Sequence, residues 1–435
     1  MSKVRLLAAV ALLAFGLAAH AAYISGHDCT GATTTSASYT STRVVNVSNI
    51  TQLNNAVSNL QAGDTIVLAN GTYALTGSLF IQQPNVTLMG NGPGCGGAII
   101  QGGGQDNASG PAHAIWTDAA NVTVAQITLR DTYDNLVVCN AGCSALHIYN
   151  TKLINSGSQF VKINGSNAAK IGGVVVEYSR FEYTADAPND HGSGLGYGYF
   201  NGISAHGTSG VIVRDNTFYR LRVSDACTDA CQNPSVLIWN GSINPVVERN
   251  LFIEVDQAIS FGLVQRGSYT DCSGGIARNN VIYNPAGFWS AGRQSNGSND
   301  GLIRTFEGPN SKVYNNTVIS NNSMGYCVAN RFATSTGVLI RNNLCDKGIN
   351  ASDLGASATL NNNVTNASSG MFAAFADANL HLVSGATTAI DQGFNVLSDV
   401  AGDFDAVARS LPLDIGAYAF GSLLPGPANY RRVPQ

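Results

Sequence analysis

Val211-Ile212-Val213-Arg214-Asp215-Asn216 is one copy of a phrase that recurs along this chain of 435 residues. Its clearest other copies are Val246-Val247-Glu248-Arg249-Asn250 and Ile276-Ala277-Arg278-Asn279-Asn280. Alternating apolar residues and β-branched side chains predict a short strand in each copy. Asparagine tolerates the left-handed backbone of a sharp turn, and stacked side-chain amides can hydrogen-bond to one another. Each copy therefore predicts a strand that ends at a tight turn.

Ten copies of the phrase end at positions 91, 127, 151, 179, 216, 250, 280, 316, 343 and 363, so neighbouring copies are 20 to 37 residues apart. A second short strand lies between copies, as in Val161-Lys162-Ile163 and Ile203-Ser204-Ala205-His206. Constant strands joined by variable loops are typical of a solenoid and not of a sandwich. The sequence thus predicts an all-β stack of about ten coils. The asparagines expected at equivalent turns are Asn216, Asn250, Asn280, Asn316 and Asn343.

The composition excludes several classes of protein. Hydrophobic residues make up 44% of the chain, which is too many for a disordered protein and enough for a large core. Charged residues make up only 11% and the net charge is −4, so the basic face of a nucleic-acid-binding protein is not expected. Beyond the N-terminus, no apolar run is long enough to predict a membrane span.

The N-terminus has the pattern of a secretory signal. Lys3 and Arg5 precede an apolar run that reaches Ala19, and Ala19-His20-Ala21 forms a small-residue cleavage site. Residues 1–21 are therefore predicted to be a cleavable signal peptide, and the mature protein is expected to be secreted or periplasmic. Such a compartment permits disulfide bonds.

All nine cysteines follow the predicted cleavage site. Cys139 with Cys143 and Cys227 with Cys231 are close enough in sequence to bridge within a turn. The candidates for longer links are Cys29 with Cys95 and Cys327 with Cys345, and the odd count leaves Cys272 as the expected free thiol.

Both ends of the repeat region resemble a known superfamily. The opening combines the amphipathic stretch Ile50–Val57 with Ala62–Leu68 and Gly71-Thr72-Tyr73, and the ending carries Ile390-Asp391-Gln392-Gly393 and Leu413–Tyr418. This pattern resembles the pectate-lyase-like superfamily of right-handed parallel β-helices. The resemblance implies an N-terminal capping helix, which shields the open end of the stack. It also implies that Ile390–Gly393 and Leu413–Tyr418 belong to the last coil.

The resemblance gives the expected domain organisation. Residues 22–43 are an N-terminal extension, residues 44–420 are a single β-helix domain, and residues 421–435 are a C-terminal tail. In this superfamily the substrate groove usually follows the strand that precedes each asparagine phrase. One fold hosts several activities in such families, so the chemistry has to be argued from side chains.

Two neighbouring strands bring polar side chains to that expected groove. If Ile203 and Ala205 point inward, Ser204 and His206 point outward, and one coil earlier Lys162 and Asn164 do the same. Adjacent strands are about 4.8 Å apart, so these side chains can share one site. We expect Lys162 and His206 within about 10 Å of each other, roughly two strand spacings, beneath the loop of residues 186–200.

A lyase that acts on uronic acids needs a cation near the carboxylate and a base for the C5 proton. Lys162 or a loop arginine can supply the cation, and His206, Lys162 or a tyrosine can supply the base. The long glycine-rich loop before His206 adds further candidates, because loops of this length are often functional. The candidate catalytic residues are Lys162, His206 and His191. The candidate substrate-binding residues are Asn164, Ser204, Tyr197, Tyr199, Trp239, Asn240 and Arg304.

Family motifs match this segment in part. Asn201–Gly207 is similar to the mannuronan C5-epimerase motif at His206, although Ser204 and Gly207 stand where that motif has acidic residues. In the chondroitinase B and alginate lyase family a lysine and an arginine occupy consecutive strands; His206 falls near the lysine, and Asn240 stands where the arginine would be. No outward strand carries the aspartate pair of a polygalacturonase hydrolase.

The sequence therefore predicts a protein that acts on an acidic polysaccharide, with cleavage by β-elimination as the favoured activity. Two alternatives stay open: a non-catalytic carbohydrate-binding or adhesive protein, and a uronate C5-epimerase. No cofactor is assigned. Asp186, Asp190 and Asp256 are candidate calcium ligands, although no loop has the spacing of a known calcium motif. We expect a monomer that binds no nucleic acid and does not span a membrane.

Overall fold

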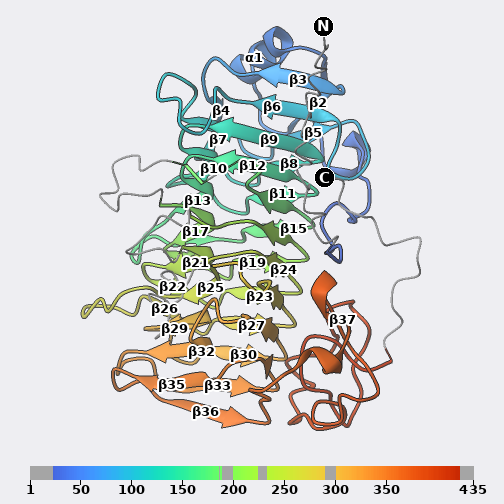
Figure 1. Cartoon of the computed structure of the whole chain (residues 1–435). Helices are drawn as coiled ribbons and strands as arrows, with labels where there is room; N and C mark the ends of the chain where they lie inside the picture. Colours follow the sequence, from blue (N-terminus) through green and yellow to red (C-terminus); the bar gives the residue numbers. More distant parts are fainter. Residues whose placement is uncertain (1–22, 186, 189–198, 224–232, 290–299, 422–435) are drawn as a thin grey trace, which may run out of the picture.

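The chain forms a stack of parallel coils, seen end to end in Figure 1. The structure is a computed structural model, and it describes residues 23–185, 187–188, 199–223, 233–289 and 300–421. Three long parallel sheets, named here A, B and C, run the length of the stack. The chain passes through sheet C, then A, then B in each coil. The predicted all-β parallel β-helix of about ten coils is confirmed.

The strands of each sheet lie in chain order along the stack. Sheet A contains β1 (Arg43–Val47), β2 (Asp64–Leu68), β5 (Thr87–Gly90), β8 (Thr123–Ala125), β11 (His147–Tyr149), β15 (Val175–Glu177), β19 (Ile212–Arg214), β23 (Val246–Glu248), β27 (Ile276–Arg278), β30 (Lys312–Tyr314), β33 (Val338–Arg341) and β36 (Ala358–Asn361). Sheet B contains β3 (Gly71–Ala74), β6 (Ala98–Gln101), β9 (Ile127–Thr132), β12 (Lys152–Ser156), β16 (Arg180–Glu182), β20 (Thr217–Tyr219), β24 (Leu251–Ile253), β28 (Val281–Tyr283), β31 (Thr317–Ile319) and β34 (Leu344–Cys345).

Sheet C is the sheet that precedes each asparagine phrase. It contains β4 (Leu79–Ile81), β7 (His113–Thr117), β10 (Asn135–Cys139), β13 (Gln159–Asn164), β17 (Asn201–His206), β21 (Pro234–Trp239), β25 (Gln257–Phe261), β29 (Gly301–Phe306), β32 (Tyr326–Arg331) and β35 (Ile349–Asp353). A short fourth sheet contains β14 (Ile171–Gly172), β18 (Thr208–Ser209), β22 (Ser242–Ile243) and β26 (Cys272–Ser273).

The repeated phrase forms the strands of sheet A, as the alternation predicts. Its inward residues, such as Val213 and Val247, are fully buried in the core between the sheets. Rings on sheet B stack in the same interior, with Phe218 lying 4.6 Å from Phe181 and 4.7 Å from Phe252 between ring centroids. Offset aromatic contacts of this kind add to the stability gained from burial alone.

The asparagines stack at equivalent turns, as predicted. Asn216 Nδ2 donates to Asn250 Oδ1 at 3.0 Å, and the same bond joins Asn250 to Asn280 at 3.0 Å. The series continues through Asn316 and Asn343. We call this series the asparagine ladder.

The left-handed backbone position is not where the sequence placed it. It is occupied by the residue before each ladder asparagine, for example Asp215 with φ 56° and Arg249 with φ 52°. The ladder asparagines therefore serve the turn through their side-chain amides, and the preceding residue supplies the sharp change in direction.

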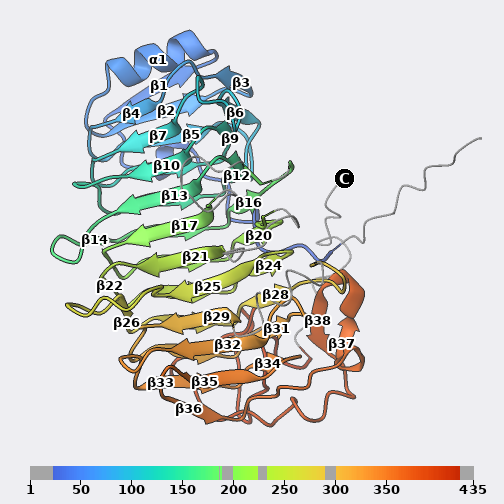
Figure 2. The same ribbon diagram turned by 60° about the vertical axis from the view of Figure 1, so that its left-hand side comes forward.

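Helix α1 (Ile50–Ser58) lies across the first coil at one end of the stack (Figure 2). Asn49 caps it by accepting a hydrogen bond from the backbone of Gln52. Its own residues Leu53 and Ala56 are buried against the coil. The predicted capping helix is confirmed. It covers backbone groups that an open stack would leave unpaired.

The coils end near Val364, which makes an isolated bridge to Leu344, and the last parallel strand is β36. Beyond it the chain folds back along the outside of sheet B, with β37 (Phe372–Ala374) and β38 (Asn379–Leu382) paired antiparallel. The ending that resembles a last coil, which contains Leu413–Tyr418, packs against this outer surface instead. Its backbone pairs with turns and not with a further coil, since Gly416 N donates to Asn342 O at 2.8 Å.

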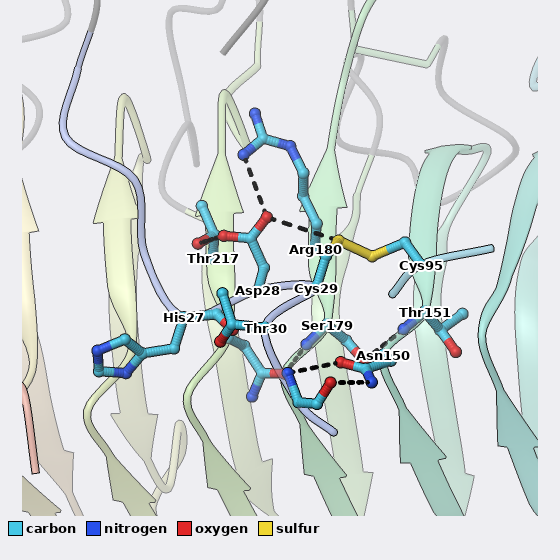
Figure 3. Close-up of a disulfide and its surroundings, with 12 residues drawn as sticks. His27, Asp28, Cys29, Thr30, Cys95, Asn150, Thr151, Ser179, Arg180 and Thr217 are labelled. Carbon is cyan, nitrogen blue, oxygen red and sulfur yellow. Dashed lines mark hydrogen bonds and ion pairs between the residues drawn. A yellow bond between two sulfur atoms is a disulfide. The ribbon is translucent and has the colours of Figure 1, made fainter. Parts of the chain in front are cut away.

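The described N-terminal residues 23–42 also lie outside the stack, and we call them the N-terminal strap. The Cys29–Cys95 disulfide fixes the strap, and Asp28 contacts Arg180 of β16 and Thr217 of β20 (Figure 3). The strap also pairs with the C-terminal segment, because Ile24 N donates to Asp377 O at 2.7 Å.

His27 holds the strap to both the coils and the C-terminal segment. Its Nδ1 lies 3.0 Å from Asp215 Oδ1, and its Nε2 lies 3.9 Å from Asp405 Oδ1. Burial opposes the charged imidazole, but hydrogen bonds and charge from these two carboxylates outweigh it and raise the pKa of His27 to about 9. His27 is therefore cationic at neutral pH and joins two anionic side chains.

The cysteine predictions are largely confirmed. Disulfides join Cys139 to Cys143, Cys29 to Cys95 and Cys327 to Cys345, and Cys272 is a buried free cysteine. Cys227 and Cys231 lie outside the described residues. Within the described ranges, no helix is both long and apolar enough to cross a membrane.

Replacing Cys29 and Cys95 together by serine is expected to lower the free energy of unfolding by about 2–4 kcal/mol. The bridge joins residues 66 positions apart and holds the strap against the coils, so its loss frees a long loop in the unfolded chain. Urea denaturation measures the effect. The control is the Cys139 and Cys143 double serine variant, whose bridge spans 4 residues and should cost less. Equal losses in the two variants would contradict the loop argument.

Candidate active site on sheet C

The outward face of sheet C carries the residues that the sequence singled out. Lys162 of β13 pairs with Ser204 of β17, and Asn164 pairs with His206, so the predicted register is confirmed. One strand further, His206 pairs with Trp239 of β21. The alternate residues, such as Val161 and Ile203, are fully buried in the core.

Lys162 and His206 are in direct contact. The Lys162 Nζ lies 2.8 Å from the His206 Nε2, and both side chains are half-buried. Burial, together with the charges of Lys162 and Arg266, lowers the pKa of His206 to about 3. At neutral pH the imidazole is therefore neutral, and its Nε2 accepts a hydrogen bond that Lys162 donates.

Lys162 is the more readily titrated of the two near neutral pH. Burial lowers the pKa of Lys162 from the ordinary value of 10.5 to about 8. A sizeable fraction of the amine is then uncharged at mildly alkaline pH. An uncharged amine on this outward face can accept a proton, which is the property required of a general base.

Arg266 supplies a cation to the same face. Its guanidinium carbon lies 5.1 Å from the centroid of the Trp239 ring, and the Trp239 ring in turn meets His206 edge to face at 4.6 Å between centroids. A guanidinium over an aromatic face is held by cation–π attraction while its donors stay available. The sequence allowed for a loop arginine here but did not single out Arg266.

Asp271 fixes the loop that presents Arg266. This carboxylate is fully buried and accepts a hydrogen bond from Arg266 Nε at 2.8 Å. It also accepts hydrogen bonds from the backbone of Asn240 at 2.7 Å, Leu263 at 2.7 Å and Val264 at 3.1 Å. Four bonds to one buried carboxylate determine the path of the loop and the direction of the arginine.

Two further contacts complete the loop. Glu307 accepts hydrogen bonds from the backbone of Arg266 at 2.9 Å and of Asp271 at 3.1 Å. Tyr269 donates its hydroxyl proton to Asn240 Oδ1 at 2.6 Å. Asn240, predicted to bind substrate, thus lies at this site but is already bonded to the loop. The sequence signal that could have pointed to Arg266 is Asp271, the acidic residue beside Cys272 at the end of the loop.

Ser204 lies where the predicted register places it, but it is covered. It stands on the outward side, between Lys162 and Leu237, is fully buried, and its hydroxyl has no hydrogen-bond partner among the described residues. Ser204 is therefore not exposed for substrate in this conformation. Asn164 is half-buried beside His206, and its amide lies 3.4 Å from the Asn140 Oδ1.

Arg304 lies on the same outward column but far from Lys162. Four strand spacings separate them along sheet C, which corresponds to about 19 Å. The guanidinium is buried, bonded to Asp300 at 3.3 Å and placed 4.9 Å from the Phe306 ring centroid. Arg304 therefore does not share the small site of Lys162 and His206.

The remaining predicted residues belong to the loop of residues 186–200, of which Tyr199 is described. Burial raises the pKa of Tyr199 to about 12, so this tyrosine is protonated at neutral pH. His191 and Tyr197, and most of the loop of residues 186–200, lie outside the described residues. Their predicted roles stay predictions.

The candidate calcium ligands gain no support from the described part of the chain. Asp256 is fully buried and accepts a hydrogen bond from the backbone of Val223 at 2.9 Å, while Asp186 and Asp190 are not described. Across the described ranges, no three His, Cys, Asp or Glu side chains are grouped so that they could hold a metal ion.

Comparisons with known proteins define the class of the fold. Neither a protein-family model nor a curated protein sequence matches this chain. Among solved structures, the crystal structure of pectate lyase Pel9A is similar with a TM-score of 0.51 and 13% identity, over 90% of this chain and 100% of that chain. The chain therefore shares the parallel β-helix fold of this pectate lyase.

Two more distant structures are also similar. A mannuronic acid specific polysaccharide family 6 lyase from human gut microbiota gives a TM-score of 0.44 at 14% identity, over 74% of this chain and 80% of that chain. The catalytic unit of a GH87 alpha-1,3-glucanase from Streptomyces thermodiastaticus gives 0.44 at 11% identity, over 72% and 60%. At these identities the likenesses concern the fold, so the chemistry rests on the side chains of sheet C.

Proposed function

We propose that this protein is a secreted polysaccharide lyase that cleaves a uronic acid polymer by β-elimination on the outward face of sheet C. The observation that carries the proposal is the 2.8 Å contact between Lys162 and His206, with the cation of Arg266 held beside it. Lys162 is the base, Arg266 binds the carboxylate of the uronate, and His206 positions the lysine amine.

In the proposed reaction, the uncharged amine of Lys162 takes the C5 proton of the uronate. The electron pair left at C5 delocalises onto the carboxylate, where Arg266 stabilises the added charge. The pair then forms the C4–C5 double bond as the C4–O4 bond breaks, and the departing oxygen takes a proton from water. One chain becomes two, and the new end is unsaturated.

The pKa values favour lysine over histidine as the base. A base with a pKa near 3, as for His206, holds a proton too weakly to compete for a carbon acid at neutral pH, whereas Lys162 has a pKa of about 8. The His206 Nε2 instead accepts a hydrogen bond from Lys162 and orients it. The positive charge of Arg266 nearby also disfavours a second cation on His206.

The proposal is tested by incubating the purified mature protein with polygalacturonate, alginate and a glucuronic acid polymer. Release of unsaturated ends, measured by ultraviolet absorbance, is the expected result on at least one polymer. Binding without product would favour the carbohydrate-binding alternative. An intact chain with altered uronate stereochemistry would favour the epimerase. Either outcome overturns the lyase.

Replacing Arg266 by alanine is expected to lower kcat/KM about 100-fold, within the range measured for loss of one charge-stabilising donor. Arg266→Lys should recover part of the rate, because it keeps the charge but not the planar donors. Initial rates on the cleaved polymer measure both. Arg220→Ala, which removes an exposed arginine from the sheet B side, is the matched control and should leave the rate unchanged. A wild-type rate in Arg266→Ala would exclude the arginine from the reaction.

A further inference from the structure

The column of outward residues that contains Lys162 continues toward the N-terminal end of sheet C. Lys162 pairs with Val138 of β10, Val138 pairs with Trp116 of β7, and Trp116 pairs with Phe80 of β4. Trp116 is thus two strand spacings from Lys162, or about 10 Å, and Phe80 is three, or about 14 Å. These two aromatic side chains share the face of the candidate active site.

Phe80 and Trp116 form an aromatic surface open to solvent. Their ring centroids are 5.6 Å apart, and the Phe80 side chain is 51% exposed. Trp116 is half-buried. Large apolar side chains are normally withdrawn from water, so two adjacent aromatic side chains that both reach solvent on one sheet face are typical of a contact surface. We call this pair the aromatic platform.

A parallel row of polar side chains borders the platform. Gln82 Nε2 lies 3.5 Å from Asp118 Oδ2, and Asn164 Nδ2 lies 3.4 Å from Asn140 Oδ1. These residues follow β4, β7 and β10 and end β13, so they form a second outward row that leads to His206. Amides and carboxylates can both accept bonds from hydroxyl groups, and the amides can also donate.

An aromatic surface beside a row of amides matches the two sides of a sugar ring. One face of a pyranose presents C–H groups that pack on aromatic rings, while its edge presents hydroxyls. We propose that the aromatic platform is a sugar-binding subsite for the same polysaccharide, two to three units from the bond at Lys162. The strand spacing of about 4.8 Å is close to the length that one unit adds to an extended chain. The polymer then runs along the stack, crossing one strand per unit.

The charges indicate how the sugar lies on the platform. Asp118 would repel a uronate carboxylate, so the polymer presents hydroxyls to the polar row and turns its carboxylate toward solvent at this subsite. The cations lie further along the stack than the aromatic platform: Lys162 is on β13, and Arg266 lies over the Trp239 ring of β21. This face of sheet C is thus aromatic on its N-terminal side and cationic at the proposed cleavage point. The position relative to the cleaved bond rests on the proposed function, but binding at the platform does not.

The test compares Phe80→Ala and Trp116→Ala, alone and together, with Phe420→Ala, which removes an exposed phenylalanine outside sheet C. The double variant is expected to raise KM on a long polymer about tenfold while kcat stays within about twofold. Disaccharides and trisaccharides, which are too short to span the three strand spacings from Lys162 to Phe80, should show a smaller change. Phe420→Ala should match the wild type in both assays. An unchanged KM and unchanged product lengths in the double variant would overturn the subsite and leave the lyase standing.

Binding is measured separately by retardation in gels that contain polygalacturonate, alginate or a glucuronic acid polymer. If the wild type is retarded but releases no unsaturated ends, the lyase fails, and weaker retardation of the platform variants still supports the subsite. Equal retardation of the platform variants and Phe420→Ala would overturn it. If none of the polymers retards the wild type, the subsite is overturned, and the release of unsaturated ends alone decides the lyase.

Discussion

Lys162→Ala should lower kcat/KM by about 10³-fold, because removal of a general base typically costs 10²–10⁴-fold. Lys162→Arg should be nearly as inactive, since arginine keeps the positive charge but does not lose its proton in the working pH range. The two variants together separate a lysine that acts as a base from one that only attracts the substrate. Release of unsaturated ends measures both rates.

The wild-type pH profile should carry the same information. The uncharged amine is the active form, so kcat/KM should rise with pH and level off above about 8, the pKa of Lys162. A profile that falls through this range would contradict the assignment.

Stability distinguishes a catalytic loss from misfolding. The folded-state pKa of about 8 lies below the ordinary value of 10.5, so at pH 7 the folded state disfavours the charged lysine. Removing the amine should therefore not lower the thermal midpoint at pH 7. Lys152→Ala, at a half-buried lysine on sheet B, is the matched control and should keep the wild-type rate. Loss of activity in that variant as well would show that the effect is not specific to the site.

Asn280→Ala should lower the free energy of unfolding by about 3–5 kcal/mol, because several buried groups lose their partners together. The Asn280 amide accepts bonds from the backbone and side chain of Asn250 at 3.1 and 3.0 Å. It also donates to Val247 O at 2.9 Å and to Asn316 Oδ1 at 3.0 Å. No water can replace these bonds readily, since Asn280 is fully buried.

Two controls calibrate this effect, which urea or thermal denaturation measures. Asn363→Ala changes the partly exposed residue that continues the asparagine ladder beyond Asn343, and it should cost only about 1 kcal/mol, because water can replace the three hydrogen bonds of its side chain. Asn54→Ala changes an exposed residue of α1 and should be near neutral. A loss in Asn280→Ala no larger than in Asn54→Ala would show that the ladder is incidental to stability.

The fold was predictable from the sequence because the same short strand pattern repeats along the chain. Alternation in Val246–Glu248 or Ile276–Arg278 fixes which side chains face the core, and repetition fixes that like strands pair. It was not predictable that the left-handed residue is the one before each ladder asparagine and not the asparagine itself. Both Asp215 and Asn216 can adopt a left-handed backbone, and only the three-dimensional stacking shows which of them uses its side chain for the ladder.

The candidate site was predictable only where it lies within the repeat. Lys162 and His206 stand on strands, so counting inward and outward positions brought them together. Arg266 comes from a loop that does not follow the repeat, and its placement depends on long-range bonds to Asp271 and Glu307. Arg304 occupies the expected column, about four strand spacings from the lysine, and its predicted role in substrate binding stays a prediction.

The strap and the C-terminal segment change how a stack of coils can come apart. In an ordinary solenoid each repeat contacts only its neighbours, so the end repeats can fray while the middle stays folded. Here His27 and Asp405 bring segments from both ends of the chain to the coil that contains Asp215. Peeling either end away must break contacts at the centre. The molecule is therefore expected to resist stepwise loss of coils and to unfold as one cooperative unit.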